Sequence, residues 1–299
     1  MLGLPQELSS DFLARLEQLR IKTRREYAGL GKGGHLSPRR GSSLEFNDYR
    51  HYSLGDDFRF IDWGLYGRTD KLYIKLFAEE EDLLTYIFVD ASASMGLPGP
   101  DRKFEMAIAS ALALAYVALS SGDRVMIRVL AGSGAAAAPG LVLGRHRIVD
   151  LARYLAAVKP AGELDLAHAL AGELLTIRRA GKVFLISDYL MMTNSVTRGL
   201  GLFTAANMDV TAVQILGGGE LDGSGLDGDV ELVDAETGEA VRVSVGAHER
   251  ERHHETMLRL SREIKTFCFR HGLHYVLYVT GTNFTDFFLR AVSELGLVH

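Results

Sequence analysis

An aspartate and two serines alternate at Asp90, Ser92 and Ser94, directly after the apolar run 83–89. A run of that length and composition is typical of a fully buried strand, so we expect the three side chains just beyond its carboxyl end. Ligand sites of open α/β sheets lie at that edge. One carboxylate and two hydroxyls offer the hard oxygen ligands that suit Mg²⁺. If both hydroxyls bind directly, the ion keeps most of its charge and attracts a carboxylate from another protein.

A second carboxylate is expected at the same edge. Asp188 directly follows the apolar run 183–187, which is also typical of a buried strand. Between the two strands, the stretch 162–170 precedes a helical pattern and reads Gly-Glu-Leu-Asp-Leu-Ala-His-Ala-Leu. The three segments resemble the loops of the metal-ion-dependent adhesion site of von Willebrand factor A domains, written D-x-S-x-S in the first loop and G-T-D-L-x-x-A-L in the second. In the alternative interpretation, Asp90 caps a helix within a loop of small residues.

The second loop departs from the adhesion-site pattern at its liganding threonine. That position is Leu164 when Asp165 is aligned without a gap, and Glu163 when Gly162 is the anchor. Leucine cannot bind a metal, whereas glutamate would add an anionic ligand and weaken the pull of Mg²⁺ on a partner's carboxylate. Whether the metal site functions is therefore left open by this loop.

The resemblance nevertheless implies Mg²⁺ as the cofactor, with Mn²⁺ or Ca²⁺ as other candidates. It implies direct binding by Ser92 and Ser94, and partly water-mediated binding by Asp90 and Asp188. Glu163 is an additional candidate ligand under the second alignment.

The segment before the first strand resembles a narrower family. Residues 48–63 read Asp-Tyr-Arg-His-Tyr-Ser-Leu-Gly-Asp-Asp-Phe-Arg-Phe-Ile-Asp-Trp. They are similar to the signature Y-R-x-Y-x-x-G-D-D-x-R-x-I-D-W of the bacterial "domain of unknown function fifty-eight" family. The resemblance is dense over residues 33–96, and it implies a von Willebrand A-like domain that works beside a MoxR-type AAA+ ATPase. The signature residues are Arg50, Tyr52, Gly55, Asp56, Arg59, Asp62, Trp63 and Arg68.

The signature also has a physical interpretation. Its arginines alternate with aspartates in a segment without helical period, so charge-assisted Arg–carboxylate pairs are expected to pin it to the sheet domain. Trp63, the only tryptophan, would supply the apolar anchor. We expect Arg50, Arg59, Asp62 and Trp63 to be largely buried, paired or packed. A recognition surface for a partner is the alternative interpretation.

The elements that must position these residues follow from the hydrophobic pattern. From residue 83 onward, apolar runs alternate with helical patterns of ten or more residues, which predicts βα units and a mostly parallel sheet. The expected strands are 84–90, 124–131, 141–143, 183–187, 209–216 and 274–280, and the expected helices are 103–120, 146–158, 165–179, 195–206, 249–271 and 284–295. Together with the resemblance, this predicts an α/β, von Willebrand A-like fold, with a doubly wound sheet and helices on both faces.

The domain organisation follows from where this alternation begins. Residues 1–82 are expected to form an extension packed on the main domain, 83–299, with a surface β-hairpin insertion at about 217–247. Within the extension we expect an amphipathic helix at 7–27, then short strands at 44–46, 58–61 and 72–77.

Composition limits the classes of partner. The 299 residues carry 33 Lys and Arg against 38 Asp and Glu, a net charge of −5, so nucleic acid is not an expected partner. A single cysteine, Cys268, fits a reducing compartment. The amino terminus lacks a signal-peptide pattern, and the apolar stretch 106–119 is short for a bilayer. We expect a cytoplasmic protein with no direct membrane span.

Three functions fit these observations. The first is a non-catalytic adaptor that binds a MoxR-type AAA+ ATPase or a client protein through an acidic side chain on its metal. The second is a Mg²⁺-dependent phosphatase or hydrolase that uses Asp90 and Asp188. The third is a structural domain with a non-functional metal site. The sequence contains no phosphate loop, no G-x-S-x-G elbow and no second aspartate at position 92, which favours the adaptor.

Overall fold

The computed structural model describes residues 5–21, 45–53, 56–78, 84–97, 100–132, 137–191, 193–235 and 238–294. The chain divides into two compact units. Unit 1 combines Met1–Arg25 with Leu83–His299, and unit 2 is Glu26–Asp82. The expected boundary at residue 82 agrees with this division, although the first helix belongs to unit 1. That residues 29–82 pack on the main domain stays a prediction.

Unit 1 is built on a six-stranded sheet with the order β10-β7-β6-β3-β4-β5. Its parallel strands are β3 (Leu84–Asp90), β4 (Arg124–Leu130), β6 (Lys182–Ser187), β7 (Asp209–Leu216) and β10 (His274–Val279). The short edge strand β5 (Val142–Leu143) is antiparallel to β4. The predicted α/β fold with a mostly parallel sheet is confirmed.

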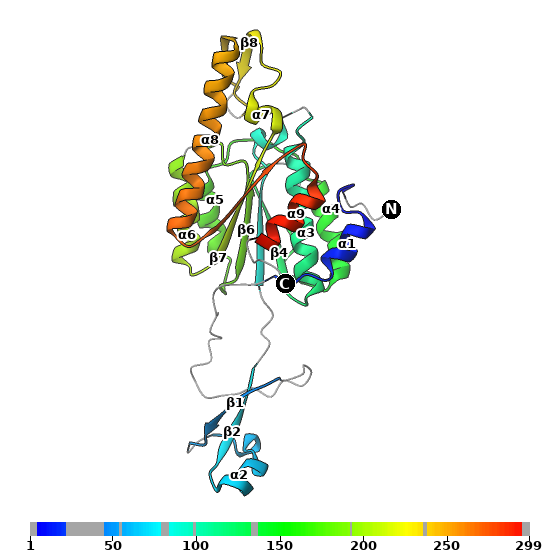
Figure 1. Ribbon diagram of the computed structural model, residues 1–299, viewed down its shortest axis with the longest axis vertical. Coiled ribbons are helices and arrows are strands. Elements are labelled where there is room, and N and C mark those ends of the chain that lie inside the picture. Colours follow the sequence, from blue (N-terminus) through cyan, green and yellow to red (C-terminus); the bar gives the residue numbers. More distant parts are fainter. Residues whose placement is uncertain are drawn as a thin grey trace. The chain divides into compact units, whose positions relative to one another are not determined.

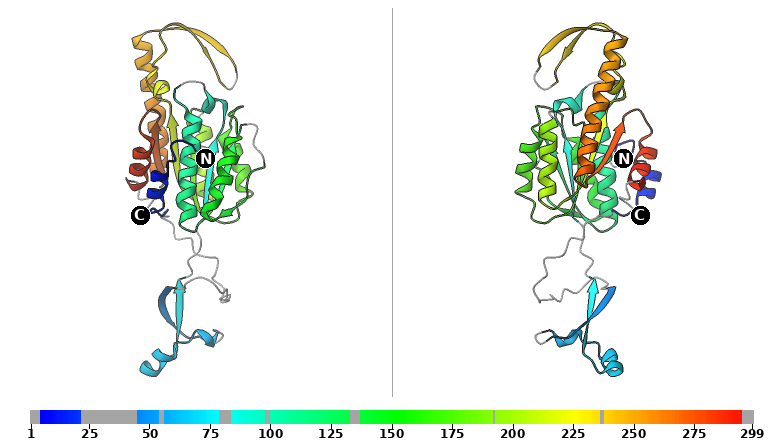
Figure 2. Two further views of the ribbon diagram at one scale, coloured as in Figure 1. Left: turned by 90° about the vertical axis from the view of Figure 1, so that its right-hand side faces the viewer. Right: turned by 60° about the vertical axis from the view of Figure 1, so that its left-hand side comes forward.

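Helices cover both faces of this sheet (Figures 1 and 2). One face carries α1 (Ser10–Leu16), α3 (Lys103–Ser120), α4 (Ile148–Ala156) and α9 (Phe284–Glu294), and the other carries α5 (Leu166–Leu174), α6 (Thr193–Ala205) and α8 (Ala247–Arg270). Strand β3 shows the reason. Ile87 and Val89 join the core on the α3 side, while Tyr86 and Phe88 join the core on the α6 side. Because successive side chains of a strand point to opposite faces, an uninterrupted apolar run requires cover on both.

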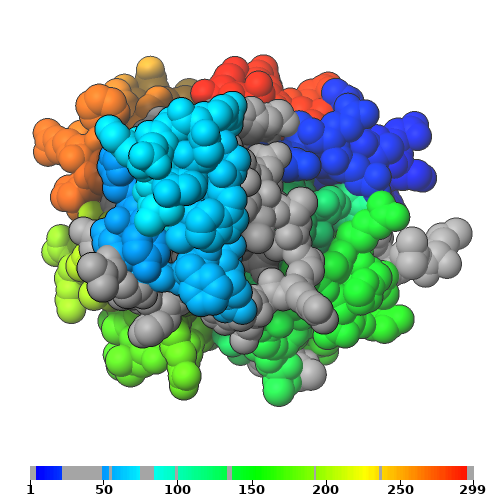
Figure 3. All heavy atoms as spheres, turned by 90° about the horizontal axis from the view of Figure 1, so that it is seen from below, coloured from blue at the N-terminus to red at the C-terminus, as the bar shows by residue number. Residues whose placement is uncertain are grey.

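Helix α1 is anchored to α9 by aromatic packing. Phe12 is 1% exposed and makes edge-on contacts with Phe284 and Phe288, at ring-centroid distances of 6.0 and 5.7 Å. Figure 3 shows α1 (dark blue) against α9 (red) on the surface. The helix is shorter than the expected 7–27, because it ends at Leu16; residues 22–27 lie outside the described part of the chain.

Helix α3 crosses the middle of the sheet. Its 18 residues have a mean hydropathy of 1.4, so by length and composition it is long enough to span a membrane. The apolar stretch 106–119 was expected to be too short to span a membrane. By length and composition that expectation is wrong, because the helix continues beyond this stretch at both ends. However, 83% of the helix is buried inside unit 1, where it packs against the sheet.

An insertion follows β7. It contains α7 (Gly218–Asp222) and the antiparallel strands β8 (Gly228–Val233) and β9 (Ala240–Val245), so the expected hairpin is confirmed. The short helix α7 was not expected from its glycines. It begins there because the Glu220 side chain accepts a hydrogen bond from the Gly217 backbone N–H (3.1 Å).

Unit 2 pairs β1 (Glu45–His51) with β2 (Tyr73–Ala78) in an antiparallel ladder, and carries the 3₁₀ turn η1 (Phe58–Phe60) and α2 (Trp63–Thr69). The expected strand at 58–61 is wrong. Asp57 accepts a hydrogen bond from the Arg59 N–H, and Asp62 accepts one from the Leu65 N–H, both at 3.0 Å. Such local acceptors favour turns and helix starts over a strand.

The signature residues pair within unit 2. Arg50 donates two hydrogen bonds of 2.7 Å to Asp56, whose Oδ2 also accepts from the Ser53 N–H. Arg59 pairs with Asp57, two residues away. Both arginines are paired, as expected, although the Arg50 and Arg59 side chains are 44% and 64% exposed. That such pairs pin the segment to the sheet domain stays a prediction.

The remaining signature residues surround α2. Asp62 accepts a 2.8 Å hydrogen bond from the Tyr49 hydroxyl. Arg68 is exposed and donates to a carbonyl of its own helix, while Tyr52 is half-buried. Gly55 lies outside the described residues. The predicted burial of Trp63 is wrong, since it is 61% exposed at the start of α2 and makes an edge-on contact with Tyr66.

Candidate metal and docking site at the carboxyl edge

Asp90 ends β3 and organises the loop that follows it. Its side chain is fully buried. One carboxylate oxygen accepts a 2.8 Å hydrogen bond from the Ser92 backbone N–H, and the other accepts a 2.6 Å hydrogen bond from the Ser187 hydroxyl. Because Ser187 ends the neighbouring strand β6, this carboxylate ties the two central loops of the sheet together.

Ser92 precedes a short 3₁₀ turn, η2 (Ala93–Gly96), and Ser94 lies within it. Ser92 is buried and Ser94 is half-buried. Their hydroxyl oxygens lie 3.1 Å apart. Octahedral coordination of Mg²⁺ at 2.0–2.1 Å places adjacent ligands about 3 Å apart, so the pair has the spacing of two neighbouring metal ligands.

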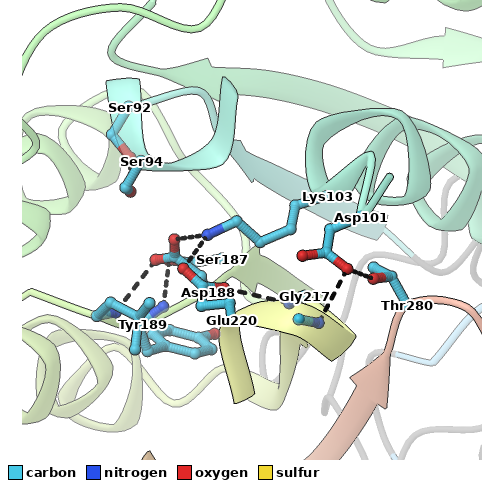
Figure 4. Close-up of polar contacts among 12 residues, drawn as sticks. Ser92, Ser94, Asp101, Lys103, Ser187, Asp188, Tyr189, Gly217, Glu220 and Thr280 are labelled. Atoms are coloured by element: carbon cyan, nitrogen blue, oxygen red, sulfur yellow. Dashed lines mark hydrogen bonds and ion pairs between the residues drawn. The ribbon is translucent and has the colours of Figure 1, made fainter. Parts of the chain in front are cut away.

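Asp188 directly follows β6 and is 1% exposed. Its Oδ1 accepts a hydrogen bond from the Leu190 N–H, and its Oδ2 lies 2.8 Å from Nζ of Lys103. Lys103 is 4% exposed and lies at the same distance, 2.8 Å, from Oε1 of Glu220 on α7. Figure 4 shows Lys103 reaching from the start of α3 to both carboxylates.

The sequence did not identify Lys103 or Glu220 as parts of this site. One signal was available. Lys103 opens an otherwise apolar, buried helix, where a cation opposes the positive end of the helix dipole. A lysine there requires acidic partners, and the fold supplies them from two loops that are distant in the sequence.

A second contact holds α7 at this edge. Asp101 accepts hydrogen bonds from the Gly219 N–H (3.2 Å) and from the Thr280 hydroxyl (3.1 Å). Gly217 approaches so closely that an added Cβ would lie 2.4 Å from Asp101 Oδ2. The glycine-rich start of the insertion is therefore required for this close packing (Figure 4).

Burial sets the electrostatics of the site. Burial, and secondarily the charge of Asp188, raise the pKa of Asp90 to about 6, although hydrogen bonds from Ser187 and Ser92 act in the opposite direction. Burial alone would lower the pKa of Lys103, but the charges of Asp188 and Glu220 outweigh it and raise that pKa. The two carboxylates therefore favour the charged form of Lys103 at this edge.

The second loop brings no hydroxyl to the serine pair. Leu164 is 5% exposed and packs in the core on the α6 side, while Glu163 is exposed. Asp165 caps α5 and accepts a hydrogen bond from Ser195. The structure therefore provides no ligand at the position of Leu164 and leaves Glu163 at the surface.

The structure thus brings only some of the candidate metal ligands together. Among the described residues, no group of three or more His, Cys, Asp or Glu side chains is arranged to hold a metal ion. A cation here would depend on the hydroxyls of Ser92 and Ser94, and it would share Asp188 with the ammonium of Lys103. Mg²⁺ binding stays a prediction.

The chain is similar to several known proteins in sequence or in structure. The uncharacterized protein Rv1480 of Mycobacterium tuberculosis is 30% identical over 229 residues, which cover 75% of this chain and 71% of the relative. An aerotolerance-related membrane protein from Bacteroides fragilis is 12% identical (72% of this chain, 98% of that chain, TM-score 0.41). A von Willebrand factor type A protein from Catenulispora acidiphila is 14% identical (75% of this chain, 44% of that chain, TM-score 0.39).

The family comparison extends over both units. The family described as "Protein of unknown function DUF58" matches residues 48–263, which include the signature residues 48–63, strands β3 and β6, and the hairpin insertion. The chain belongs to this family, as the signature in residues 48–63 predicted.

Proposed function

We propose that this chain is a non-catalytic interaction protein that binds a partner at the carboxyl edge of its sheet. The observation that carries the proposal is the burial of both acidic candidates. Asp90 is fully buried with both oxygens hydrogen-bonded, and Asp188 is 1% exposed and paired with Lys103. Ser94 remains half-buried at the surface of the same loop.

This burial argues against the phosphatase or hydrolase. A carboxylate nucleophile or base must come within hydrogen-bond reach of its substrate. Asp90 is 0% exposed, so a substrate could reach it only if the loop that covers it moved. A raised pKa is common at catalytic groups, but here burial beneath the loop explains it without a substrate.

The proposal includes a weakly held Mg²⁺. Ser92 and Ser94 would hold the ion directly, with Asp90 and Asp188 acting through water. The bound ion would supply a positive charge that an acidic side chain of the partner completes. This chain's own residues keep the donors in place: Ser187 orients Asp90, and Lys103 orients Asp188.

The partner that we propose is a MoxR-type AAA+ ATPase, with a client protein as a further binding partner. Family membership supports this choice, since the family resemblance implies work beside such an ATPase. We further propose that the complex is cytoplasmic. An ATPase would provide the energy for remodelling, and this chain would provide the surface that selects what is bound.

Equilibrium binding of the purified chain to a MoxR-type ATPase of the same organism tests the proposal. With millimolar Mg²⁺ present, Ser94→Ala should weaken binding about tenfold, as expected for the loss of one charge-linked contact. EDTA should weaken wild-type binding to the same extent. Ser293→Ala, at an exposed serine on α9, is the matched control and should have no effect.

Two results would count against the proposal. If wild type in EDTA and Ser94→Ala in Mg²⁺ both bind as tightly as wild type in Mg²⁺, the metal bridge is refuted. Mg²⁺-dependent hydrolysis of p-nitrophenyl phosphate that disappears in Asp90→Asn would establish the hydrolase instead.

A further inference from the structure

The sheet of unit 1 ends at an edge strand that is not fully covered. Among the residues that the structure describes, β10 pairs only with β7, and it lies between α8 and α9 (Figure 2). Tyr275, Val276 and Leu277, in the middle of the strand, are each partly exposed. An exposed edge presents unpaired backbone groups to which another strand can bind.

A groove of about 610 Å³ runs along this edge. Its floor includes Tyr275, Val276 and Leu277, and its walls include Leu258, Arg262 and Lys265 from α8 and Phe287, Arg290 and Ala291 from α9. Successive side chains of a strand point to opposite faces. A groove lined by three consecutive strand residues must therefore follow the edge of the strand rather than one face.

The backbone direction along β10 follows from one hydrogen bond. The Thr280 N–H donates to the carbonyl oxygen of Leu216 at the end of β7 (2.9 Å). In a parallel ladder, alternate residues direct both backbone groups to the same neighbour. Tyr275 and Leu277 therefore direct their N–H and C=O groups away from β7 and into the groove.

The groove is cationic. Arg262, Lys265 and Arg290 are exposed, and within the described part of the chain none of them forms an ion pair. Glu294 is the only acidic residue in the lining. Three cations against one anion, beside apolar side chains of both helices, complement an extended segment that carries acidic and apolar residues.

We propose that this groove binds an extended acidic segment of another protein, which adds as a strand to β10. Main-chain hydrogen bonds to Tyr275 and Leu277 would supply affinity, and Arg262, Lys265 and Arg290 would select acidic side chains. Residues 22–44 of this chain fit poorly, because they carry six Lys and Arg against one Glu. This surface is separate from the carboxyl-edge site, so the inference does not depend on the proposed function.

Peptide binding to the full-length protein tests the inference. The probe is a fluorescent peptide of six residues, the length of β10, in which Val and Glu alternate. In the control peptide Val and Lys alternate. We expect saturable binding of the Glu peptide and none of the Lys peptide. Arg262→Glu/Lys265→Glu should weaken binding at least about tenfold, since two attractive pairs become repulsive.

A matched variant separates the groove from general charge. Arg252→Glu/Arg259→Glu changes the same net charge on exposed positions of the same helix, outside the groove lining, and should leave binding unchanged. Equal loss in both double variants, or no binding of the Glu peptide to wild type and to every variant, would overturn the proposal.

Strand addition makes one more prediction. Leu277→Pro removes an N–H that faces the groove but no hydrogen bond to β7, and Leu277→Ala removes only the side chain. We expect Leu277→Pro to bind the Glu peptide at least about fivefold more weakly than Leu277→Ala, with thermal unfolding confirming that both are folded. Equal binding by the two variants would overturn the strand geometry.

The acidic run 79–82 of this chain, Glu-Glu-Glu-Asp, is a competing occupant. The variant that replaces Glu79, Glu80 and Glu81 with Gln distinguishes it. Peptide binding that is unchanged in this variant supports an external partner. Binding that appears only in this variant would overturn the proposal in favour of the chain's own segment.

Discussion

The carboxyl edge of the sheet in unit 1 and the signature segment of unit 2 both rely on ion pairs between basic side chains and carboxylates. At the edge, Lys103 and Asp188 are 4% and 1% exposed. In unit 2, Arg50 and Arg59 are 44% and 64% exposed. Buried partners cannot recover hydration when one of them is lost, whereas exposed partners can. The same pairing chemistry should therefore be essential for stability in the first region and almost neutral in the second.

The largest expected effect is at Lys103. Lys103→Met leaves Asp188 buried and Glu220 partly buried without their cation, so it should lower the free energy of unfolding by about 3–5 kcal/mol. Denaturant unfolding measures this value. Arg102→Met is the matched control, because Arg102 is 47% exposed and pairs with Glu7 and Glu105 at the surface. Comparable losses of unfolding free energy in Lys103→Met and Arg102→Met would contradict the expected difference between buried and exposed ion pairs.

A double variant sharpens this prediction. Lys103→Met/Asp188→Asn removes the cation and one of its two carboxylates, so part of the lost stability should return. A double variant that loses the sum of the two single effects would show that Lys103 and Asp188 do not act as a pair.

The next effect is a pH dependence from Asp90. Its folded pKa of about 6 lies above the usual value, so folding favours the protonated form. The stabilisation of the folded state by protonated Asp90 is fully present below pH 4 and is lost as the pH rises through 6. With EDTA present, the free energy of unfolding contributed by Asp90 should fall by about 3 kcal/mol over this range. Asp90→Asn should remove that slope; an unchanged slope would assign it to other groups.

A smaller effect is expected at Trp63. Because the ring is 61% exposed, Trp63→Ala should change the free energy of unfolding by no more than about 1 kcal/mol. Phe12→Ala, which removes a buried aromatic ring between α1 and α9, should cost about 3–5 kcal/mol. Calorimetric melting of both variants tests the contrast, and a large loss for Trp63→Ala would mean that its ring is covered in solution.

The smallest effect is expected at Arg50. In this pair the Arg50 side chain is 44% exposed and the Asp56 side chain 19%, and their hydrogen bonds raise the pKa of Arg50 and lower that of Asp56. Arg50→Ala should not measurably change the melting temperature of the whole chain relative to wild type. If the signature segment is a recognition surface, the same substitution should reduce partner binding, which an affinity measurement would detect.

The sequence predicted the parts of this fold that local patterns determine. The uninterrupted apolar runs before Asp90 and Asp188 required a covered parallel sheet, and that sheet brings both carboxylates to one edge. It did not predict Lys103 as the partner of Asp188, because the pairing depends on tertiary packing. It also overestimated the burial of Trp63. A large aromatic ring predicts burial only where the fold provides enough surrounding side chains, and α2 in a unit of two strands provides few.

Short elements were predicted less well for a related reason. The apolar run 58–61 resembled a strand, but Asp57 and Asp62 supply capping oxygens that favour a turn and a helix. The glycines from Gly217 indicated a loop, yet a short helix forms there. One carboxylate oxygen of Glu220 accepts a hydrogen bond from the Gly217 N–H, and the other accepts one from Lys103.

Hydrogen exchange of the chain with and without a MoxR-type ATPase compares the two regions directly. A partner that binds at the carboxyl edge should slow amide exchange in residues 91–97, 188–191 and 217–223, and leave exchange around Trp63 and Tyr66 unchanged. Protection confined to residues 57–70 of unit 2, with the carboxyl-edge loops exchanging as in the free protein, would contradict the account and make the signature segment the recognition surface.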